Sequence, residues 1–385
     1  MERRGRYILF LLFLFILCFP HTYANCHQRT LRHLSADPPL PPARLKNVLQ
    51  RVIISVVLGV LTGLVGAFLF GFLVRCLIGY MNRTPILKGP VIFSPKISPK
   101  TLQSALSTHN QLLLSSPNGK YYSAVVDNGL AIAVKKLEPF DMETQSKSAK
   151  RRIQQELEVL ASLKHRNVMS LRAYVREPDR LCLVYDYVIT GSLEDTMKRV
   201  RETELHLGWE VRLRVAVGII KGLHYLHFSC VPQILHCNLK PTNVMLDSEF
   251  EPRLTDCSLA KLMPNFDTLN SAYTAPECFQ NHRYTDKSDI FSFGMILGVL
   301  LTGKDPNDPF FGETGHGGSF GRWLRHLQQA GDAREALDKT IVGEEVEEDE
   351  MLMAVRIAVV CLSDLSADRP SSDELVPMLT QLHSF

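Results

Sequence analysis

One stretch of the chain is free of charge over the length that a membrane requires. Residues 52–74 form a run of 23 uncharged residues, and Arg51 and Arg75 flank it. A helix rises about 1.5 Å per residue, so this run covers a hydrocarbon layer about 30 Å thick. It predicts a single transmembrane helix over residues 52–78. The chain is thereby divided into a short first part and a long second part.

A second apolar segment lies at the N-terminus. Three arginines fall within the first six residues, residues 7–19 are apolar, and Thr22 and Ala24 provide small residues at the places that suit cleavage. This pattern is typical of a secretory signal peptide, which we place at residues 1–24. An uncleaved membrane anchor is the alternative. Both readings put the chain after Arg75 in the cytosol, so we expect a single-pass type I protein.

Small residues recur along the predicted transmembrane helix. They stand four positions apart, at Ser55, Gly59, Gly63, Ala67 and Gly71. This spacing places them on one stripe of a helix, where two backbones approach closely. We therefore predict a packing face for another membrane helix. The stripe alone does not distinguish a second copy of this chain from a different partner.

The segments on either side of the membrane helix are short. Residues 25–51 are predicted to be extracellular, and they are too few and too rich in proline to build a ligand-binding core. Residues 79–109 also contain several prolines and are predicted to be a juxtamembrane linker. The net charge of +3 gives no reason to expect nucleic acid as a partner, and the nine cysteines lack metal-ligand spacing.

Residues 110–385 are long enough for one large domain. Residues 121–126 and 130–137 alternate as a hairpin around Asp127-Asn128-Gly129, and residues 147–163 have helical spacing. Long helical patterns follow. This order predicts an α+β fold of two lobes, a small one rich in strands and a larger helical one.

Short motifs recur through this domain in a fixed order. They are Ala133-Val134-Lys135, Glu156, His165-Arg166-Asn167, residues 183–187, Gly191-Ser192-Leu193, residues 236–243, Asp256, Ala275-Pro276-Glu277, residues 289–294 and Arg369. In order and spacing they resemble the protein-kinase signatures over roughly residues 110–383. With the altered motifs described next, the chain resembles the receptor-like pseudokinases of plants.

The phosphate-binding loop departs from the kinase pattern. Its three glycines are expected at Leu114, Ser116 and Gly119, and two of these positions carry side chains. Glycine is needed because the loop backbone approaches phosphate closely. The valine that packs on adenine in the family is replaced by Tyr121. A phenol there either fills the space of the nucleotide or points outward.

The catalytic motifs depart as well. Asn238 stands where the family has the aspartate that accepts the substrate proton, and the loss of a general base lowers rates by about 10² to 10⁴. Cys237 replaces an arginine. Cys257 and Ser258 follow Asp256 in place of Phe-Gly. We therefore predict an inactive kinase, with a weakly active or unconventional serine/threonine kinase as the alternative.

Several residues of the expected type remain. They are Gly119, Lys135, Glu156, Lys240, Asn243 and Asp256. They either preserve nucleotide binding or serve structure, with Lys135 paired to Glu156. We favour the structural interpretation and expect no cofactor, neither ATP nor magnesium, and no metal site. Thr268, Ser271, Tyr273 and Thr274 are candidate sites for phosphorylation by another kinase.

The resemblance implies a signalling role. Receptor-like pseudokinases of this kind act as adaptors or co-receptors for a leucine-rich-repeat receptor-like protein, in CLAVATA-type perception of secreted peptides that limits stem cells in meristems. The implied partners are that protein, reached through the transmembrane helix in a hetero-oligomer, and receptor kinases. The implied location is the plasma membrane, with the endoplasmic reticulum as a location before assembly. An inhibitory regulator of an active kinase is equally compatible with the sequence.

Overall fold

The computed structural model describes residues 42–81, 90–107, 111–116, 119–137, 147–176, 181–187, 191–261, 271–281, 283–311, 318–343 and 345–382. The predicted signal peptide and most of the predicted extracellular segment lie outside these residues. The chain divides into two units, residues 1–84 and residues 85–385, which are described separately.

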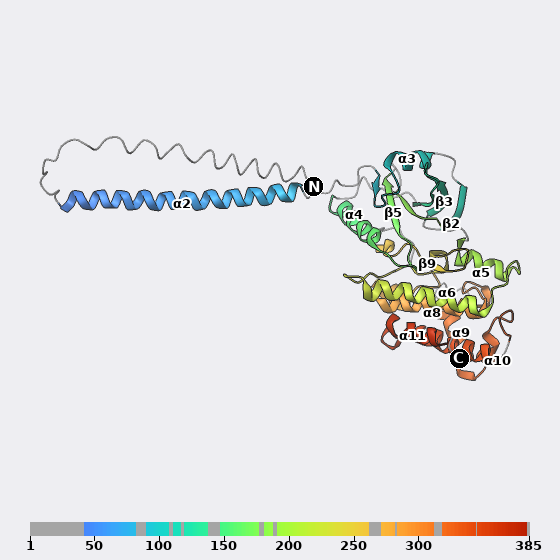
Figure 1. Ribbon diagram of the computed structural model, residues 1–385. Coiled ribbons are helices and arrows are strands. Elements are labelled where there is room, and N and C mark those ends of the chain that lie inside the picture. Colours follow the sequence, from blue (N-terminus) through green and yellow to red (C-terminus); the bar gives the residue numbers. More distant parts are fainter. Residues whose placement is uncertain are drawn as a thin grey trace. The chain divides into compact units, whose positions relative to one another are not determined.

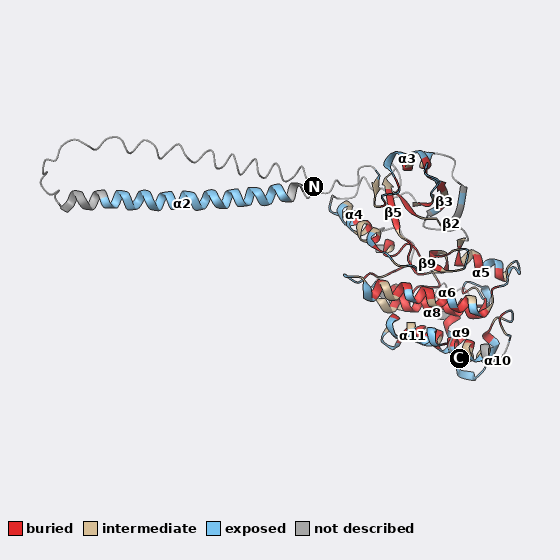
Figure 2. Cartoon of the chain, viewed as in Figure 1, coloured by how far each residue is buried: buried red, intermediate tan, exposed pale blue. Residues whose placement is uncertain are grey.

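The first unit contains one long helix, α2 (Pro42–Met81) (Figure 1). Its segment Leu49–Ile78 has a mean hydropathy of 2.6, and none of its most apolar window is buried (Figure 2). Ser55 and Thr62 donate their hydroxyl hydrogens to backbone carbonyls one turn earlier, so these polar groups are satisfied within the helix. The predicted apolar helix is therefore confirmed, and it is long enough to cross a bilayer.

The small lobe of the second unit is built on an antiparallel sheet of six strands. The strands are β1 (Val91–Ile92), β2 (Gln111–Ser116), β3 (Gly119–Val125), β4 (Ala131–Leu137), β5 (Leu171–Arg176) and β6 (Leu181–Asp186). Their order across the sheet is β1-β5-β6-β4-β3-β2. The predicted hairpin corresponds to β3 and β4, joined by a turn in which Gly129 has a φ of +79°.

Two helices cover the two faces of this sheet. On one face, α4 (Lys147–Ser162) contributes Ile153, Leu157 and Leu160 to the main core. On the other face, α3 (Pro99–Ser107) buries Leu102 and Ala105 in a second, smaller core. The alternation of side chains along the strands divides the sheet residues between these two cores.

The position of β1 and α3 corrects one prediction. We expected residues 79–109 to be a linker, yet β1 pairs with β5, and α3 packs on the sheet. The folded domain therefore includes residues 91–107. These elements are missed from sequence because β1 has only two residues and the short helix follows a run of prolines.

The large lobe is helical. Its helices are α5 (Leu193–Arg201), α6 (Trp209–His224), α7 (Pro276–Asn281), α8 (Asp286–Thr302), α9 (Gly318–Ala330), α10 (Glu345–Cys361) and α11 (Ser372–Gln381). A three-stranded sheet of β7 (Gly191–Ser192), β8 (Val244–Leu246) and β9 (Pro252–Leu254) lies between the lobes. Capping boxes at Ser192, Thr285 and Ser371 start α5, α8 and α11.

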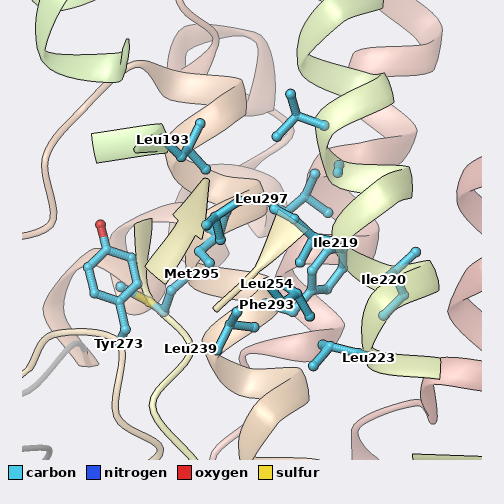
Figure 3. Close-up of a cluster of buried hydrophobic side chains, with 14 of the residues drawn as sticks. Leu193, Ile219, Ile220, Leu223, Leu239, Leu254, Tyr273, Phe293, Met295 and Leu297 are labelled. Carbon is cyan, nitrogen blue, oxygen red and sulfur yellow. The ribbon is translucent and has the colours of Figure 1, made fainter. Parts of the chain in front are cut away.

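The centre of the large lobe is α8. Fifteen of its residues, from Ser288 to Thr302, are buried, in keeping with a helix that is apolar on nearly all sides (Figure 2). Leu239 of the catalytic loop (residues 236–243) and Leu254 of β9 belong to the same core as Phe293 and Met295 of α8 (Figure 3). The core of α8 thereby positions the loop segments that carry the candidate site.

Two buried arginines tie the large lobe together. Arg369 binds Glu277 through two hydrogen bonds of 2.6 and 2.8 Å. Arg212 donates to two backbone carbonyls and, at 2.7 Å, to Asp338. Guanidinium groups are buried at low cost when such planar, multiple bonds satisfy them. The position of Arg369 agrees with the sequence motif, whereas nothing in the sequence analysis indicated Arg212.

Candidate functional site

A buried tyrosine of the small lobe contacts the segment that follows β9. Tyr121 of β3 and Lys135 of β4 are direct partners across the two strands, so their side chains share one face of the sheet. Tyr121 has an exposed fraction of 0%, and the Lys135 ammonium lies 4.8 Å from the centre of its ring. Of the two orientations that the sequence allowed, the structure has the inward one.

The Tyr121 hydroxyl spans the cleft. It donates a hydrogen bond of 3.2 Å to Asp256 and lies 3.2 Å from the hydroxyl of Thr255. Burial, followed by the charge of Asp256, raises the pKa of Tyr121 well above its ordinary value. The phenol therefore keeps its proton and remains a donor. Its ring occupies the place that the family resemblance assigns to packing against adenine.

The retained lysine and aspartate bind each other. The Lys135 ammonium forms a buried ion pair with Oδ2 of Asp256, while the second oxygen of Asp256 accepts from Tyr121. We expected Lys135 to pair with Glu156 of α4. That expectation is corrected: within the described residues Lys135 has its ion pair with Asp256, and Glu156 is half-buried without one.

The catalytic loop keeps its backbone geometry. Asp289 of α8 accepts hydrogen bonds of 2.8 Å from the amides of His236 and Cys237, and Cys237 has a φ of +65°. Burial alone raises the pKa of Asp289, but hydrogen bonding and charge from His227, with a smaller effect of His236, lower it below its ordinary value. Asp289 is therefore ionised, and it holds the loop in place.

The group at the proton-acceptor position is an amide. Asn238 is buried, and its side-chain nitrogen has no hydrogen-bond partner among the described residues. The backbone carbonyl of Asn238 accepts a hydrogen bond of 2.8 Å from the side-chain amide of Asn243, so Asn243 supports the loop. A recess beside Asn238 is lined by Tyr273 and Thr274. A hydroxyl entering that recess meets no carboxylate at position 238.

The segment after β9 also keeps a kinase-like course with altered residues. Asp256 and Ser258 have φ values of +63° and +62°, and the Ser258 amide donates to the carbonyl of His236 at 3.0 Å. Cys257 is buried in the main core. Serine at a left-handed position adds strain that the usual glycine avoids.

The remaining predicted residues lie around this cleft. Gly119 begins β3 opposite Ser116, and the loop between them falls outside the described residues. Lys240 is half-buried in the catalytic loop. The stripe from Ser55 to Gly71 belongs to α2, in the other unit, where the space around each of its glycines is open.

Two of the candidate phosphorylation sites are buried in this structure. Tyr273 and Thr274 have exposed fractions of 7% and 9%, so an external kinase does not reach their hydroxyls in this conformation. Burial raises the pKa of Tyr273 well above its ordinary value. Ser271 is half-buried, and Thr268 lies outside the described residues.

The arrangement does not fit ATP and magnesium as the kinase fold uses them. The Tyr121 ring stands in the adenine region, and both oxygens of Asp256 are bound by protein groups. Chemically, the site offers a closed, hydrogen-bonded contact between the lobes.

Comparisons with known proteins agree with this geometry. The chain belongs to the protein kinase family, because the family model described as "Protein kinase domain" matches residues 116–376. Within this family it is a catalytically inactive, receptor-like member. It is 63% identical over 366 residues to "Inactive leucine-rich repeat receptor-like protein kinase CORYNE" of Arabidopsis thaliana, covering 94% of this chain and 91% of that protein.

More distant relatives share the domain. The chain is 36% identical to the leucine-rich-repeat receptor-like serine/threonine/tyrosine kinase SOBIR1 of Arabidopsis thaliana. The match covers 76% of this chain and 49% of SOBIR1. Among solved structures, the pseudokinase domain of BIR2, described as an immune regulator of the RLK/Pelle family, matches with a TM-score of 0.62. That match has 27% identity and covers 80% of this chain and 93% of the other.

Proposed function

We propose that this protein is a signalling adaptor or co-receptor whose kinase-like domain binds partners and transfers no phosphate. The observation that carries this proposal is the buried contact of Tyr121, Lys135 and Asp256, together with an amide at position 238. The partner is a leucine-rich-repeat receptor-like protein, reached through the membrane helix. The process is the CLAVATA-type perception of secreted peptides that limits stem cells in meristems. The location is the plasma membrane.

The proposal includes the absence of a bound nucleotide. To admit adenine, Tyr121 has to leave a fully buried position and give up its bond to Asp256. Magnesium then has to displace Lys135 from the same carboxylate. Breaking a buried ion pair is costly because each charge is left without its partner. Both costs reduce the affinity for ATP.

The test is nucleotide binding by thermal shift. We expect the detergent-solubilised chain to show no shift with ATP and magnesium, because ligand binding raises the melting temperature only when the folded state binds. Tyr121→Val removes the phenol and should give a measurable shift if the cleft is otherwise intact. Tyr122→Val, on the opposite face of the same strand, is the matched control. A clear shift of the unaltered chain at cellular ATP concentrations overturns this part of the proposal.

A second experiment separates an adaptor from a weak kinase. Replacing Lys135 alone leaves Asp256 buried without its partner, so a loss of signalling is then ambiguous. The double variant Lys135→Met with Asp256→Asn removes both charges and retains the volume of the side chains. An adaptor should still signal in a plant that lacks the native protein. A kinase should lose its signalling although the variant accumulates normally.

The orientation in the membrane is part of the proposal and has its own test. Asn82-Arg83-Thr84 is a glycosylation sequon just beyond the apolar helix. If the kinase-like domain is cytosolic, this asparagine never meets the glycosylating enzymes. A glycosidase-sensitive change in mobility that disappears in Asn82→Gln contradicts the orientation.

A further inference from the structure

Charge is divided unevenly between the two lobes. Residues 91–186, which make up the small lobe, contain 14 Lys and Arg against 9 Asp and Glu. Residues 187–385 contain 18 against 29. The net charge of +3 for the whole chain conceals this separation. The small lobe is therefore positive and the large lobe strongly negative.

Part of the positive charge lies on one face of the sheet or beside the helix that covers it. Ala124, Ile132 and Val134 share a core with Leu102 and Ala105 of α3, and side chains two positions apart along a strand share a face. Lys120 of β3 and Lys136 of β4 therefore lie on the face that α3 covers in part. Lys96 and Lys100 are exposed just before α3 and in its first turn. The Lys96 carbonyl accepts a hydrogen bond from Asn128 of the β3–β4 turn, so Lys96 lies toward the end of the hairpin that is remote from Lys120 and Lys136. We call Lys96, Lys100, Lys120 and Lys136 the basic face.

The basic face is arranged unfavourably for the domain on its own. Lys120 and Lys136 stand directly opposite each other in the β3–β4 ladder, where like charges repel. Lys100 lies in the first turn of α3, which has no acidic residue, although cations are unfavourable at a helix N-terminus. Within the described residues, none of the four ammonium groups forms an ion pair. An external anion would relieve these repulsions.

The chain itself indicates which anion is nearest. The apolar segment of α2 ends at Ile78, and β1 begins at Val91. The 12 intervening residues reach at most about 45 Å when fully extended. Since β1 is hydrogen-bonded into the sheet, the small lobe is tethered close to the membrane that holds α2.

The surroundings of the basic face also suit a lipid surface. Leu112 of β2 is 51% exposed and is the direct partner of Tyr122, whose ring lies 5.1 Å from the Lys136 ammonium. Aromatic, apolar and basic side chains together are typical of surfaces that contact lipid headgroups. Charge attraction extends only about 8 Å at physiological salt, so a tether is needed to keep the face within reach.

We propose that the basic face docks on an anionic membrane surface. Lysine ammonium groups bind the phosphate and carboxylate groups of acidic lipid headgroups, and Leu112 and Tyr122 enter the headgroup layer. The negative large lobe then points into solution, where it is free to meet protein partners. This inference uses the membrane attachment of the chain, but it needs neither the proposed receptor partner nor an empty nucleotide site.

The experiment compares lysine reactivity in the full chain held in lipid nanodiscs. Discs contain phosphatidylcholine alone or phosphatidylcholine mixed with phosphatidylserine, an uncharged acylating reagent modifies the lysines, and mass spectrometry reads each site. We expect Lys96, Lys100 and Lys120 to react several-fold more slowly in the anionic discs, with recovery in high salt. Lys221 and Lys339, exposed on the large lobe, are the internal controls and should not change.

A charge-reversal pair completes the test. Each lysine near an anionic surface contributes roughly a fivefold factor in occupancy. Lys100→Glu with Lys120→Glu should therefore abolish the slow reaction of Lys96 in anionic discs. Lys221→Glu with Lys339→Glu should leave the rate at Lys96 as slow as in the unaltered chain. Far-ultraviolet circular dichroism checks that both variants are folded.

Three outcomes overturn the proposal. The first is an equal rate at Lys96 in the two kinds of disc. The second is equal slowing at Lys221, which shows a general effect of the disc. The third is slowing that requires an added acidic protein and occurs in neutral discs, which assigns the face to a protein. None of these outcomes changes the expected result of the nucleotide-binding test. The adaptor proposal therefore stands or fails independently of the membrane proposal.

Discussion

At the scale of single residues, the retained kinase residues are explained by burial. Lys135 and Asp256 are both nearly inaccessible, and a buried charge requires a partner and hydrogen bonds. Each supplies the partner of the other, and Tyr121 donates to the remaining oxygen. Their presence is therefore accounted for without catalysis. The tyrosine completes the contact that a nucleotide and a metal ion would otherwise interrupt.

Ser258 gives the first prediction at this scale. It has a φ of +62°, and an L-residue in that region costs about 1–2 kcal/mol. Glycine avoids the strain but loses more entropy on folding, by about 0.5–1 kcal/mol. We expect Ser258→Gly to stabilise the domain by about 0.5–1 kcal/mol in thermal or urea unfolding. Ser258→Ala keeps the Cβ atom and should bring no gain, so equal stability of the two variants contradicts the assignment of strain.

His236 gives a prediction about pH. It is fully buried, both ring nitrogens lack partners in the described part of the chain, and burial lowers its pKa below the ordinary value. The unfolded chain therefore binds a proton more readily than the folded chain. Stability is retained above about pH 6.5 and falls as the pH drops toward the lowered pKa.

The measurement compares His236→Leu with the unaltered chain. Linkage limits the contribution of one group to about 1.4 kcal/mol per pH unit. We expect the stability of the unaltered chain to decrease more steeply between pH 6.5 and pH 5 than that of the variant. Parallel pH profiles would mean that the imidazole has the same pKa in the folded and unfolded chains, which contradicts a pKa lowered by burial.

At the scale of elements, sequence patterns predicted the strongly periodic segments. The predicted helix at 147–163 corresponds to α4, and the two predicted strands correspond to β3 and β4. In α3, Leu102, Ala105 and Leu106 have the spacing of an amphipathic turn, but nine residues beside prolines carry too little signal. Its burial depends on a sheet face that only the folded chain creates.

The candidate site was predictable in position but less so in its contacts. Motif spacing indicated Tyr121, Lys135, Asn238 and Asp256 as the altered or retained site residues, and the structure joins Tyr121, Lys135 and Asp256 in one contact. The partner of Lys135 was predicted incorrectly, because the choice between Glu156 and Asp256 depends on how closely α4 approaches the sheet. The burial of Tyr273 was missed because a loop next to a buried helix has no periodic pattern of its own.

α3 provides a prediction at the scale of elements. Leu102 has an exposed fraction of 0% and lies in the core shared with the sheet. Leu102→Ala leaves a cavity and should destabilise the domain by about 2–5 kcal/mol. Gln103→Ala, on the exposed side of the same helix, should change stability by less than about 0.5 kcal/mol. Thermal unfolding of both variants shows whether residues 91–107 belong to the folded domain. If Leu102→Ala lowers the stability no more than Gln103→Ala does, these residues are not part of the folded domain.

At the scale of the whole molecule, the membrane helix is the proposed route by which an extracellular signal reaches the kinase-like domain. Residues 25–51 are too few to form a recognition domain, and the proposed ligand is bound by a partner. Lipid tails are as apolar as leucine, so a membrane helix gains specific association from close packing rather than from burial of apolar surface. Small residues on one stripe allow that packing, and the open space around Gly59 and Gly63 leaves room for it.

The last prediction follows from this geometry. Gly59→Leu with Gly63→Leu places two bulky side chains between the helices and should reduce co-purification with the receptor-like partner by roughly tenfold or more, since contacts of this kind contribute about 1–2 kcal/mol. Leu61→Phe with Val65→Leu adds bulk to the opposite side of α2 and should leave the partner bound. Undiminished recovery with the glycine pair rules out the stripe as the contact, whereas equal loss with both pairs indicates a general disturbance of the helix. Because the substitutions lie far in sequence from Tyr121 and Lys135, their effect on signalling also separates partner capture from any property of the cleft.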